Sequence, residues 1–368
     1  LVMNDGKPQA FFDHPSYFTI LSVKTWFQFM HSLGLLDAWK LSAIPSALNV
    51  PGFDAAMTSA VRAGRIVAWL TATLFVVIFA ALARRLFRDW RIALLATFAF
   101  AFSGGMAVHM RILRSELIAA CLFTFALMLL IAVARRAGNW RPLATGVAAA
   151  LCVLGMENKV QIILLIAALP VIMLPFGGTE SASTAFWRGS AAWLAVLLSG
   201  LAAAAMLAFA WPLIGVGLEP ESIDIAQLHA LIAGRFGIYQ ITLLVWIGIG
   251  MIAFAALWRV SAAETLASMF AVAAGASLGL LALYIAFDPQ NVVAVVNPIE
   301  KMLVFADAPA TSATEGGKIW AAIALLFEGI KSVLQRYTFV LFTSPRPTVF
   351  LTWLVFPGIV YAWIRGER

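Results

Sequence analysis

The chain has 368 residues, of which 62% are hydrophobic and only 12% are charged, and its formal net charge is +7. Soluble globular domains carry about a quarter charged residues, so this composition excludes that class and indicates an integral membrane protein. The two cysteines, Cys121 and Cys152, both lie inside apolar runs. They therefore do not indicate a disulfide framework or a metal cluster.

Long apolar runs separated by charged residues, glycine or proline dominate the sequence. A helix needs roughly 20 apolar residues to cross the hydrocarbon core of a bilayer. The runs therefore predict an all-α polytopic membrane protein with about nine or more transmembrane helices. Taken in chain order, they lie at 62–83, 91–108, 115–134, 142–157, 160–176, 189–213, 238–258, 265–287 and 347–364.

Two further segments, 15–37 and 319–342, are apolar but interrupted by charged or imidazole side chains. In the second, apolar residues recur every three or four positions, which indicates an amphipathic helix lying on the bilayer. We expect both segments to be interfacial. The sequence thus predicts four regions: a first outer loop with interfacial helices (1–60), a transmembrane core (61–287), an outer loop with an amphipathic helix (288–346), and a last transmembrane helix with a cytoplasmic end (347–368).

Two short basic loops orient the chain. Residues 83–91 and 134–141 together hold seven arginines and one acid, which predicts that both loops are cytoplasmic. Because successive spans cross the membrane in opposite directions, this orientation assigns eleven basic and four acidic residues to the inner face. The difference between the two numbers equals the whole net charge of +7. The excess of basic residues is therefore explained by the orientation of the chain in the membrane, and no motif indicates a nucleic-acid partner.

The first candidate site on the predicted outer face is the opening segment, with Asp5, Asp13 and His14 before the apolar run. A carboxylate beside an imidazole suits acid/base chemistry or the binding of a phosphate-bearing ligand. The alternative is a solvated loop in which Pro15 begins an interfacial helix.

The second candidate is the stretch 103–117, where His109, Arg111, Arg114 and Glu116 crowd into a short turn. Two guanidinium groups so close together suit a phosphate or diphosphate, because their forked donors match its oxygens. Alternatively, the arginines snorkel to the interface and pair with Glu116.

Two smaller features complete the outer face. Lys159, in "GMENKVQ", lies between two apolar runs and could bind an anionic headgroup, or could belong to an ordinary hairpin turn. Arg62 and Arg65 lie about one helical turn apart at the start of a run, where they could bind a substrate or simply snorkel.

The loops at 214–237 and 288–346 are candidates for acceptor recognition. The sequence contains no phosphate-binding loop, dinucleotide fingerprint or paired metal-ligand spacing. No motif therefore calls for a cofactor, and the use of a divalent metal ion stays an open question.

Taken together, these motifs resemble those of the GT-C glycosyltransferases, with protein O-mannosyltransferases and lipid A aminoarabinose transferases as the nearest pattern. His14 and Pro15 match an "HPP" or "KPP" stretch of the first outer loop, with Ser16 in place of the second proline. Arg111, Arg114 and Glu116 match an arginine followed by an acid at the outer start of a helix, with Glu where Asp is usual, and Lys159 matches the lysine of a "tK" turn.

The resemblance implies a protein of the bacterial inner membrane whose active site faces the periplasm. It implies transfer of a sugar from a polyprenyl-phosphate carrier to a lipid, glycan or protein acceptor, with inversion at the anomeric carbon. The base in such enzymes stands upstream of the "HP" stretch, in a segment that we expect to precede Leu1. The resulting candidates are Asp5, Asp13 and Glu116 as catalytic residues and His14, His109, Arg111, Arg114, Lys159, Arg62 and Arg65 as substrate-binding residues.

Two other functions are weighed against this one. A transporter or lipid flippase would be expected to show an internal repeat or an acid in the middle of a span, and the sequence shows neither. A non-catalytic subunit of a membrane complex is the other alternative.

Overall fold

The computed structural model describes residues 1–7, 16–87, 89–112, 114–134, 139–159, 184–218 and 236–286, together with nine single positions. This part of the chain forms ten α-helices and two short 3-10 helices, without strands. The all-α prediction is therefore confirmed for the described residues. The bounds of the helices are η1 Val2–Asp5, α1 Tyr17–Ser32, η2 Leu41–Ala43, α2 Val50–Leu86, α3 Trp90–Ala101, α4 Gly104–His109, α5 Ser115–Ala134, α6 Arg141–Asn158, α9 Ala185–Arg188, α10 Ala191–Leu218, α12 Phe236–Leu257 and α13 Ala262–Ala286.

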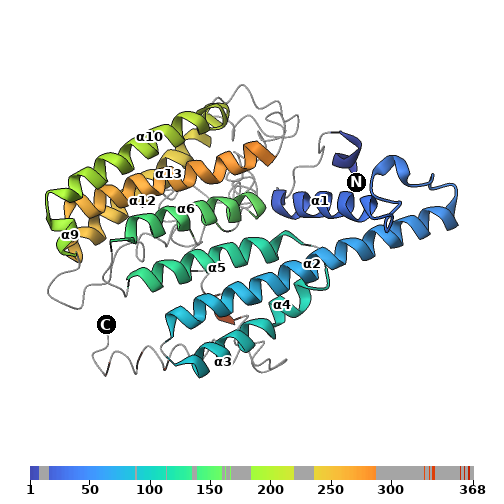
Figure 1. The fold of residues 1–368 in the computed structure, drawn as a ribbon, viewed down its shortest axis with the longest axis horizontal. Coiled ribbons are helices and arrows are strands. Elements are labelled where there is room, and N and C mark those ends of the chain that lie inside the picture. Colours follow the sequence, from blue (N-terminus) through green and yellow to red (C-terminus); the bar gives the residue numbers. More distant parts are fainter. Residues whose placement is uncertain are drawn as a thin grey trace, which may run out of the picture.

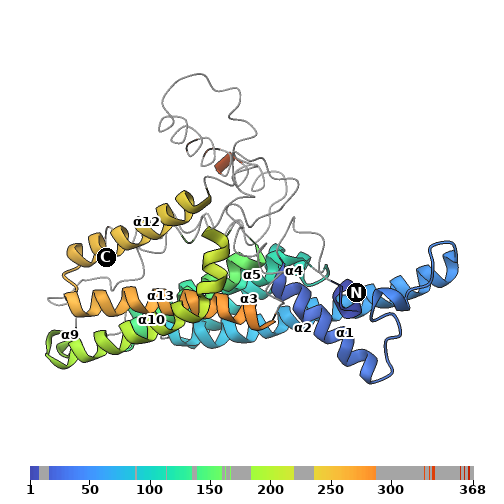
Figure 2. The same ribbon diagram turned by 90° about the horizontal axis from the view of Figure 1, so that it is seen from above.

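The long helices lie side by side in the order α10, α13, α6, α5, α2 and α3, and each packs against the next (Figure 1). Helix α12 packs against α13 and α10 from one side of this row (Figure 2). Some neighbours in this row are consecutive in sequence, such as α5 and α6, but α13 lies between α10 and α6. The order of helices in space therefore differs from their order along the chain.

Four helices in the described residues are long and apolar enough to cross a membrane: Val50–Leu86, Ser115–Val133, Ala191–Trp211 and Ala262–Ala282. They correspond to the predicted runs 62–83, 115–134, 189–213 and 265–287, which agrees with a multi-pass membrane protein. Helices α6 and α12 cover the runs 142–157 and 238–258. The runs 160–176 and 347–364 and the amphipathic segment 319–342 lie almost entirely outside the described residues.

The run 91–108, predicted as one span, forms two helices instead. Helix α3 ends at Ala101, and α4 begins at Gly104 after a new N-cap, because the Ser103 hydroxyl accepts a hydrogen bond from the Met106 amide at 3.2 Å. A serine in this position satisfies an amide that would otherwise lack a partner at the start of a helix. With 12 residues, α3 rises only about 18 Å and is too short to cross a bilayer alone.

Helix α2 begins at Val50, well before the predicted start at residue 62, and runs through the expected boundary between the first two regions. Asn49 caps it by accepting a hydrogen bond from the Gly52 amide at 3.3 Å, and a proline occupies its first turn. Its 37 residues rise about 55 Å, far more than the hydrocarbon core requires. The N-terminal part of α2 therefore projects beyond its neighbours (Figure 1).

Helix α1 packs on this projecting part of α2. Phe27 and Leu36, from α1 and the loop after it, are buried against Ala60 and Ala63 of α2. With 16 residues, α1 rises about 24 Å and is short for a span. The segment 15–37 thus contributes to a small separate core beside the helix row.

Helices α6 and α13 approach each other closely through glycines. A Cβ atom added to Gly275 would collide with the carbonyl group of Gly146, and one added to Gly279 would lie 2.9 Å from the Cβ of Val153. Small residues allow this approach, which is a common basis of helix packing in membranes. At the start of the same two helices, the buried side chains of Arg141 and Glu264 form an ion pair at 3.0 Å.

Candidate functional site

The carboxyl-terminal end of α6 meets the starts of α1 and α5 at a single residue, Asn158, which is fully buried. Its Nδ2 donates to the carbonyl oxygen of Ser115 at 2.6 Å, and its Oδ1 accepts from the amide of Thr19 at 3.2 Å. The hydroxyl of Thr19 lies 3.3 Å from the Asn158 amide group. One side chain thus joins three helices whose residues are 43 and 139 positions away in sequence. One residue from each of three candidate motifs is therefore found at this junction: Ser16 of "HPS" (14–16), Ser115 of "RSE" (114–116) and Asn158 of "ENK" (157–159).

Ser16, the last residue of the "HPS" motif, has an unusual backbone conformation. Its φ of 52° lies in the left-handed region, and its amide donates to the carbonyl oxygen of Asn158 at 3.2 Å. A proline could do neither, because its ring fixes φ near −65° and it has no amide hydrogen. The serine that replaces the second proline of the related motif therefore has a structural reason in this chain.

Glu116 and Lys159 form an ion pair beside this junction. The Lys159 Nζ donates to Oε1 of Glu116 at 3.0 Å, and the lysine side chain is 12% exposed while the glutamate side chain is 35% exposed. Two candidate residues from separate motifs are therefore brought together at the entrance to the helix row. The pair holds a primary amine against a carboxylate, and both side chains are in partial contact with solvent.

Glu157 is a buried carboxyl that the sequence prediction did not include among the site residues. It is 1% exposed, and its Oε2 has no hydrogen-bond partner among the described residues. Burying a polar atom without a partner costs about 1–3 kcal/mol, so such atoms are uncommon in folded proteins. Tyr17 of α1 is also buried, and burial raises the pKa of its phenol. The sequence signal for Glu157 was its position in the "ENK" turn between two apolar runs.

His109 lies at the end of α4, on the same side of the junction as Glu116. Its side chain is half-buried, and its Nδ1 is enclosed with no hydrogen-bond partner in the part of the chain that the structure describes. The ring is close enough to Glu116 for the two groups to interact electrostatically. His109 thus lies beside the ion pair of Glu116 and Lys159.

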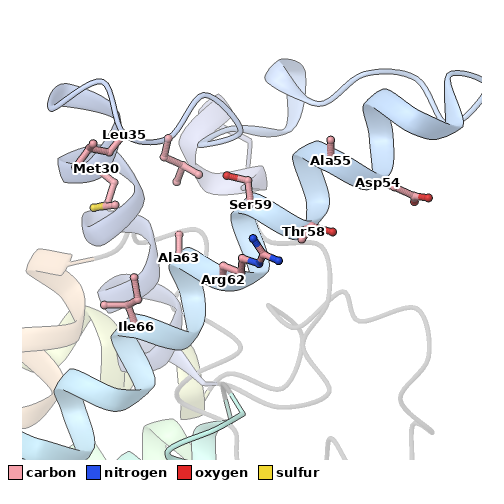
Figure 3. Close-up of a pocket in the computed structure, with 10 residues that line it drawn as sticks. Met30, Leu35, Asp54, Ala55, Thr58, Ser59, Arg62, Ala63 and Ile66 are labelled. Atoms are coloured by element: carbon pink, nitrogen blue, oxygen red, sulfur yellow. The ribbon is translucent and has the colours of Figure 1, made fainter.

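The arginine candidates lie on the exposed surface around this junction. Arg65 of α2 and Arg111 of the turn after α4 line one open hollow of about 560 Å³, together with Trp69 and Met110. Arg62, one turn earlier on α2, lines a second hollow with Asp54, Ser59 and Met30 (Figure 3). Arg114 is exposed immediately before α5. The structure therefore distributes the four arginines over neighbouring surfaces.

Asp5 has a different environment from the other candidate acids. Its Oδ1 accepts from the Ser42 hydroxyl at 2.6 Å, and its Oδ2 accepts from the Ser42 amide at 2.8 Å. The hydrogen bond from the Ser42 hydroxyl lowers the pKa of this exposed carboxyl. These contacts give Asp5 a role in holding the turn at η2. The other two candidates of the opening segment, Asp13 and His14, lie outside the described residues.

The described residues contain no group of three histidine, cysteine or acidic side chains that could together hold a metal ion. No family model, no curated protein and no solved structure matches this chain. Function is therefore inferred from the chemistry of the residues themselves. That chemistry is a cationic rim with one enclosed carboxyl, placed where membrane helices end.

Proposed function

We propose that this chain is a GT-C type glycosyltransferase that moves a sugar from a polyprenyl-phosphate carrier to an acceptor. One observation supports this proposal most: three residues that are distant in sequence meet through hydrogen bonds. They are Ser16, Ser115 and Asn158, one from each of the "HPS", "RSE" and "ENK" motifs. The ion pair of Glu116 and Lys159 is part of the same junction. A resemblance carried by separated short motifs predicts such a meeting, whereas unrelated surface turns do not.

The proposed position in the cell follows from the charges at the helix ends. Arg84 and Arg85 occupy the last turn of α2, and under the positive-inside rule this end is cytoplasmic. The junction at Asn158 is then on the outer side, facing the periplasm of a bacterial inner membrane. In this proposal the described helices belong to a bundle of about nine or more transmembrane helices.

The proposed reaction is a direct displacement. An acceptor hydroxyl attacks the anomeric carbon and loses its proton to a carboxylate base, while the bond from that carbon to the phosphate oxygen breaks. The lipid phosphate leaves with the bonding electrons, so the configuration at the anomeric carbon inverts. Lys159 and Arg114 are proposed to stabilise the negative charge that develops on the leaving phosphate, with Arg111 and His109 at the rim.

The carboxylates divide into different roles in this mechanism. Glu116 accepts from Lys159 and is therefore proposed to position the lysine. Both oxygens of Asp5 are engaged by Ser42, which leaves Asp13, three residues before Ser16 in sequence, as the proposed base within this chain.

The test uses the purified full chain in lipid vesicles with a series of radiolabelled polyprenyl-phosphate sugars. We expect label to move from the carrier to an added acceptor lipid or glycan. Arg114→Ala should lower kcat by about 10²- to 10³-fold, the usual effect of removing one group that stabilises a developing oxyanion. Glu116→Gln should impair the same step by releasing Lys159.

Arg91→Gln is the matched control, because Arg91 is exposed at the opposite end of the helix row and should not influence transfer. Absence of transfer from every donor, together with uptake of solute that depends on an ion gradient, would overturn the proposal in favour of a transporter. Equal losses in Arg114→Ala and Arg91→Gln would also contradict it.

A further inference from the structure

The hollow shared by Arg65 and Arg111 is built from two separate parts of the chain. Arg65, Ile66 and Trp69 come from α2, whereas Met110, Arg111 and Ile112 come from the turn between α4 and α5. The hollow has a volume of about 560 Å³ and is open on one side. Helices α2 and α4 lie next to each other in both views (Figures 1 and 2). Two guanidinium groups thus face one apolar-walled space.

The depth of this hollow can be deduced from two helices independently. Arg65 is 19 residues before Arg84 on the continuous helix α2, a rise of about 29 Å, which equals the thickness of the hydrocarbon core. Arg111 lies four residues before Ser115, where the apolar run of α5 begins. Both arginines are therefore level with the boundary between hydrocarbon and headgroups.

The two arginines have no acidic partner in the part of the chain that the structure describes. The ion pairs found there join Arg141 to Glu264 and Lys159 to Glu116, and neither involves this hollow. Arg65 and Arg111 are both exposed. Two unneutralised guanidinium groups at headgroup depth favour an anionic ligand with several oxygen acceptors, since their forked donors match a phosphate group.

We propose that Arg65 and Arg111 bind the phosphodiester headgroup of an anionic bilayer phospholipid, whose acyl chain begins along Trp69. Trp69 lies one turn further into the membrane than Arg65 and is 52% exposed, so its indole offers an apolar surface below the two cations. Tryptophan is enriched at this depth because its ring is apolar while its N–H is polar. The combination of cationic rim and apolar wall complements a lipid better than a soluble anion.

Arg111 is the one residue that this hollow shares with the proposed sugar-transfer site. None of the residues at the Asn158 junction lines the hollow. The inference therefore does not depend on the proposed function, and a binding measurement tests it without any enzymatic assay. A bound phospholipid here would hold the start of α5 against α2.

The experiment measures the binding of fluorescently labelled phosphatidylglycerol to the purified full chain in phosphatidylcholine nanodiscs. We expect wild type to retain the anionic lipid in preference to phosphatidylcholine. Arg65→Gln and Arg111→Gln should each weaken that binding about tenfold, the effect of losing one charge-assisted contact. Arg65→Lys should fall between wild type and Arg65→Gln, because it keeps the charge and loses the fork.

Arg62→Gln is the matched control, since Arg62 is exposed one turn away on the same helix and lines the other hollow (Figure 3). Equal losses from Arg62→Gln and Arg65→Gln would overturn the inference, because a general surface charge would then explain the binding. Displacement of the lipid by millimolar inorganic phosphate would contradict it in favour of a soluble-anion site. Retention of polyprenyl phosphate alone would assign the hollow to the donor and would also overturn it. Helical circular dichroism of every variant shows that it is folded.

Discussion

The Nζ of Lys159 lies 3.0 Å from Oε1 of Glu116, although 43 residues separate the two in sequence. This contact links the end of α6 to the start of α5 directly beside the buried Asn158. Because Glu116 is the more exposed partner, the pair faces the rim of the junction rather than its core. A charged ligand that reaches the rim therefore meets the Glu116 carboxylate first, with the Lys159 amine held behind it.

The strength of this ion pair can be measured by a double-mutant cycle. Lys159→Gln and Glu116→Gln should each destabilise the protein slightly, and the double variant should lose less than the sum. For a partly exposed pair we expect a coupling energy of about 1 kcal/mol, decreasing as salt rises. The measurement is chemical denaturation in detergent at two salt concentrations. Strict additivity would show that the pair contributes nothing.

Asn158→Ala should loosen the attachment of α1 to the helix row. The change removes the hydrogen bonds to Ser115 and Thr19 and takes away the side-chain acceptor of the buried Thr19 amide. We expect a loss of about 1–3 kcal/mol. Hydrogen exchange should accelerate at the Thr19 amide. Asn49→Ala, which removes only the exposed cap of α2, is the control and should leave α1 exchange unchanged.

Gly275→Ala should destabilise the contact between α6 and α13. The added methyl group would collide with the Gly146 backbone, so one helix must move away, at a cost of about 1–3 kcal/mol. Gly248→Ala in α12 is the matched control, because the nearest atom to its added Cβ is the Met269 methyl at 3.9 Å. That variant should be neutral or slightly stabilising, since alanine favours helix more than glycine does. Thermal unfolding of the two proteins compares them, and equal effects would refute the close approach.

Removing one partner of the buried Arg141–Glu264 pair should be far more damaging than removing both. Either Arg141→Met or Glu264→Leu alone leaves a buried charge, with an expected cost of about 3–5 kcal/mol. The double variant should recover most of the lost stability, as apolar replacements of buried ion pairs often do. Denaturation midpoints of the three variants provide the measurement. A double variant as unstable as the worse single one would contradict this prediction.

Asp5 should titrate below the ordinary range for aspartate. Because its pKa is lowered in the folded chain, its hydrogen bonds to Ser42 stabilise the fold above the ordinary carboxyl pKa. This stabilisation is lost as pH falls through the lowered value. Ser42→Ala should raise the pKa of Asp5 toward its ordinary value, as followed by carbon NMR of the labelled carboxyl. Ser46→Ala, whose hydroxyl bonds to the Leu48 amide, is the control and should leave the Asp5 titration unchanged.

Local pattern was sufficient to predict the helical class and the approximate positions of several helices. The runs 115–134 and 265–287 agree with α5 and α13 to within a few residues, because an uninterrupted apolar run has one favourable conformation in a membrane. The break at Ser103 and the early start of α2 were missed. Both depend on capping side chains at Ser103 and Asn49, whose energy is small beside that of the apolar run.

The sequence by itself determined that Glu116, Lys159 and the arginines stand near helix ends, since charged side chains are costly within hydrocarbon. Only the tertiary structure decided which of them meet. Asn158 joins α1, α5 and α6 by hydrogen bonds across 139 and 43 residues, and Arg65 and Arg111 share a hollow on a different surface. Such pairings depend on how closely the helices pack, as at Gly146 and Gly275. The distance between two helices cannot be predicted from the apolar runs that form them.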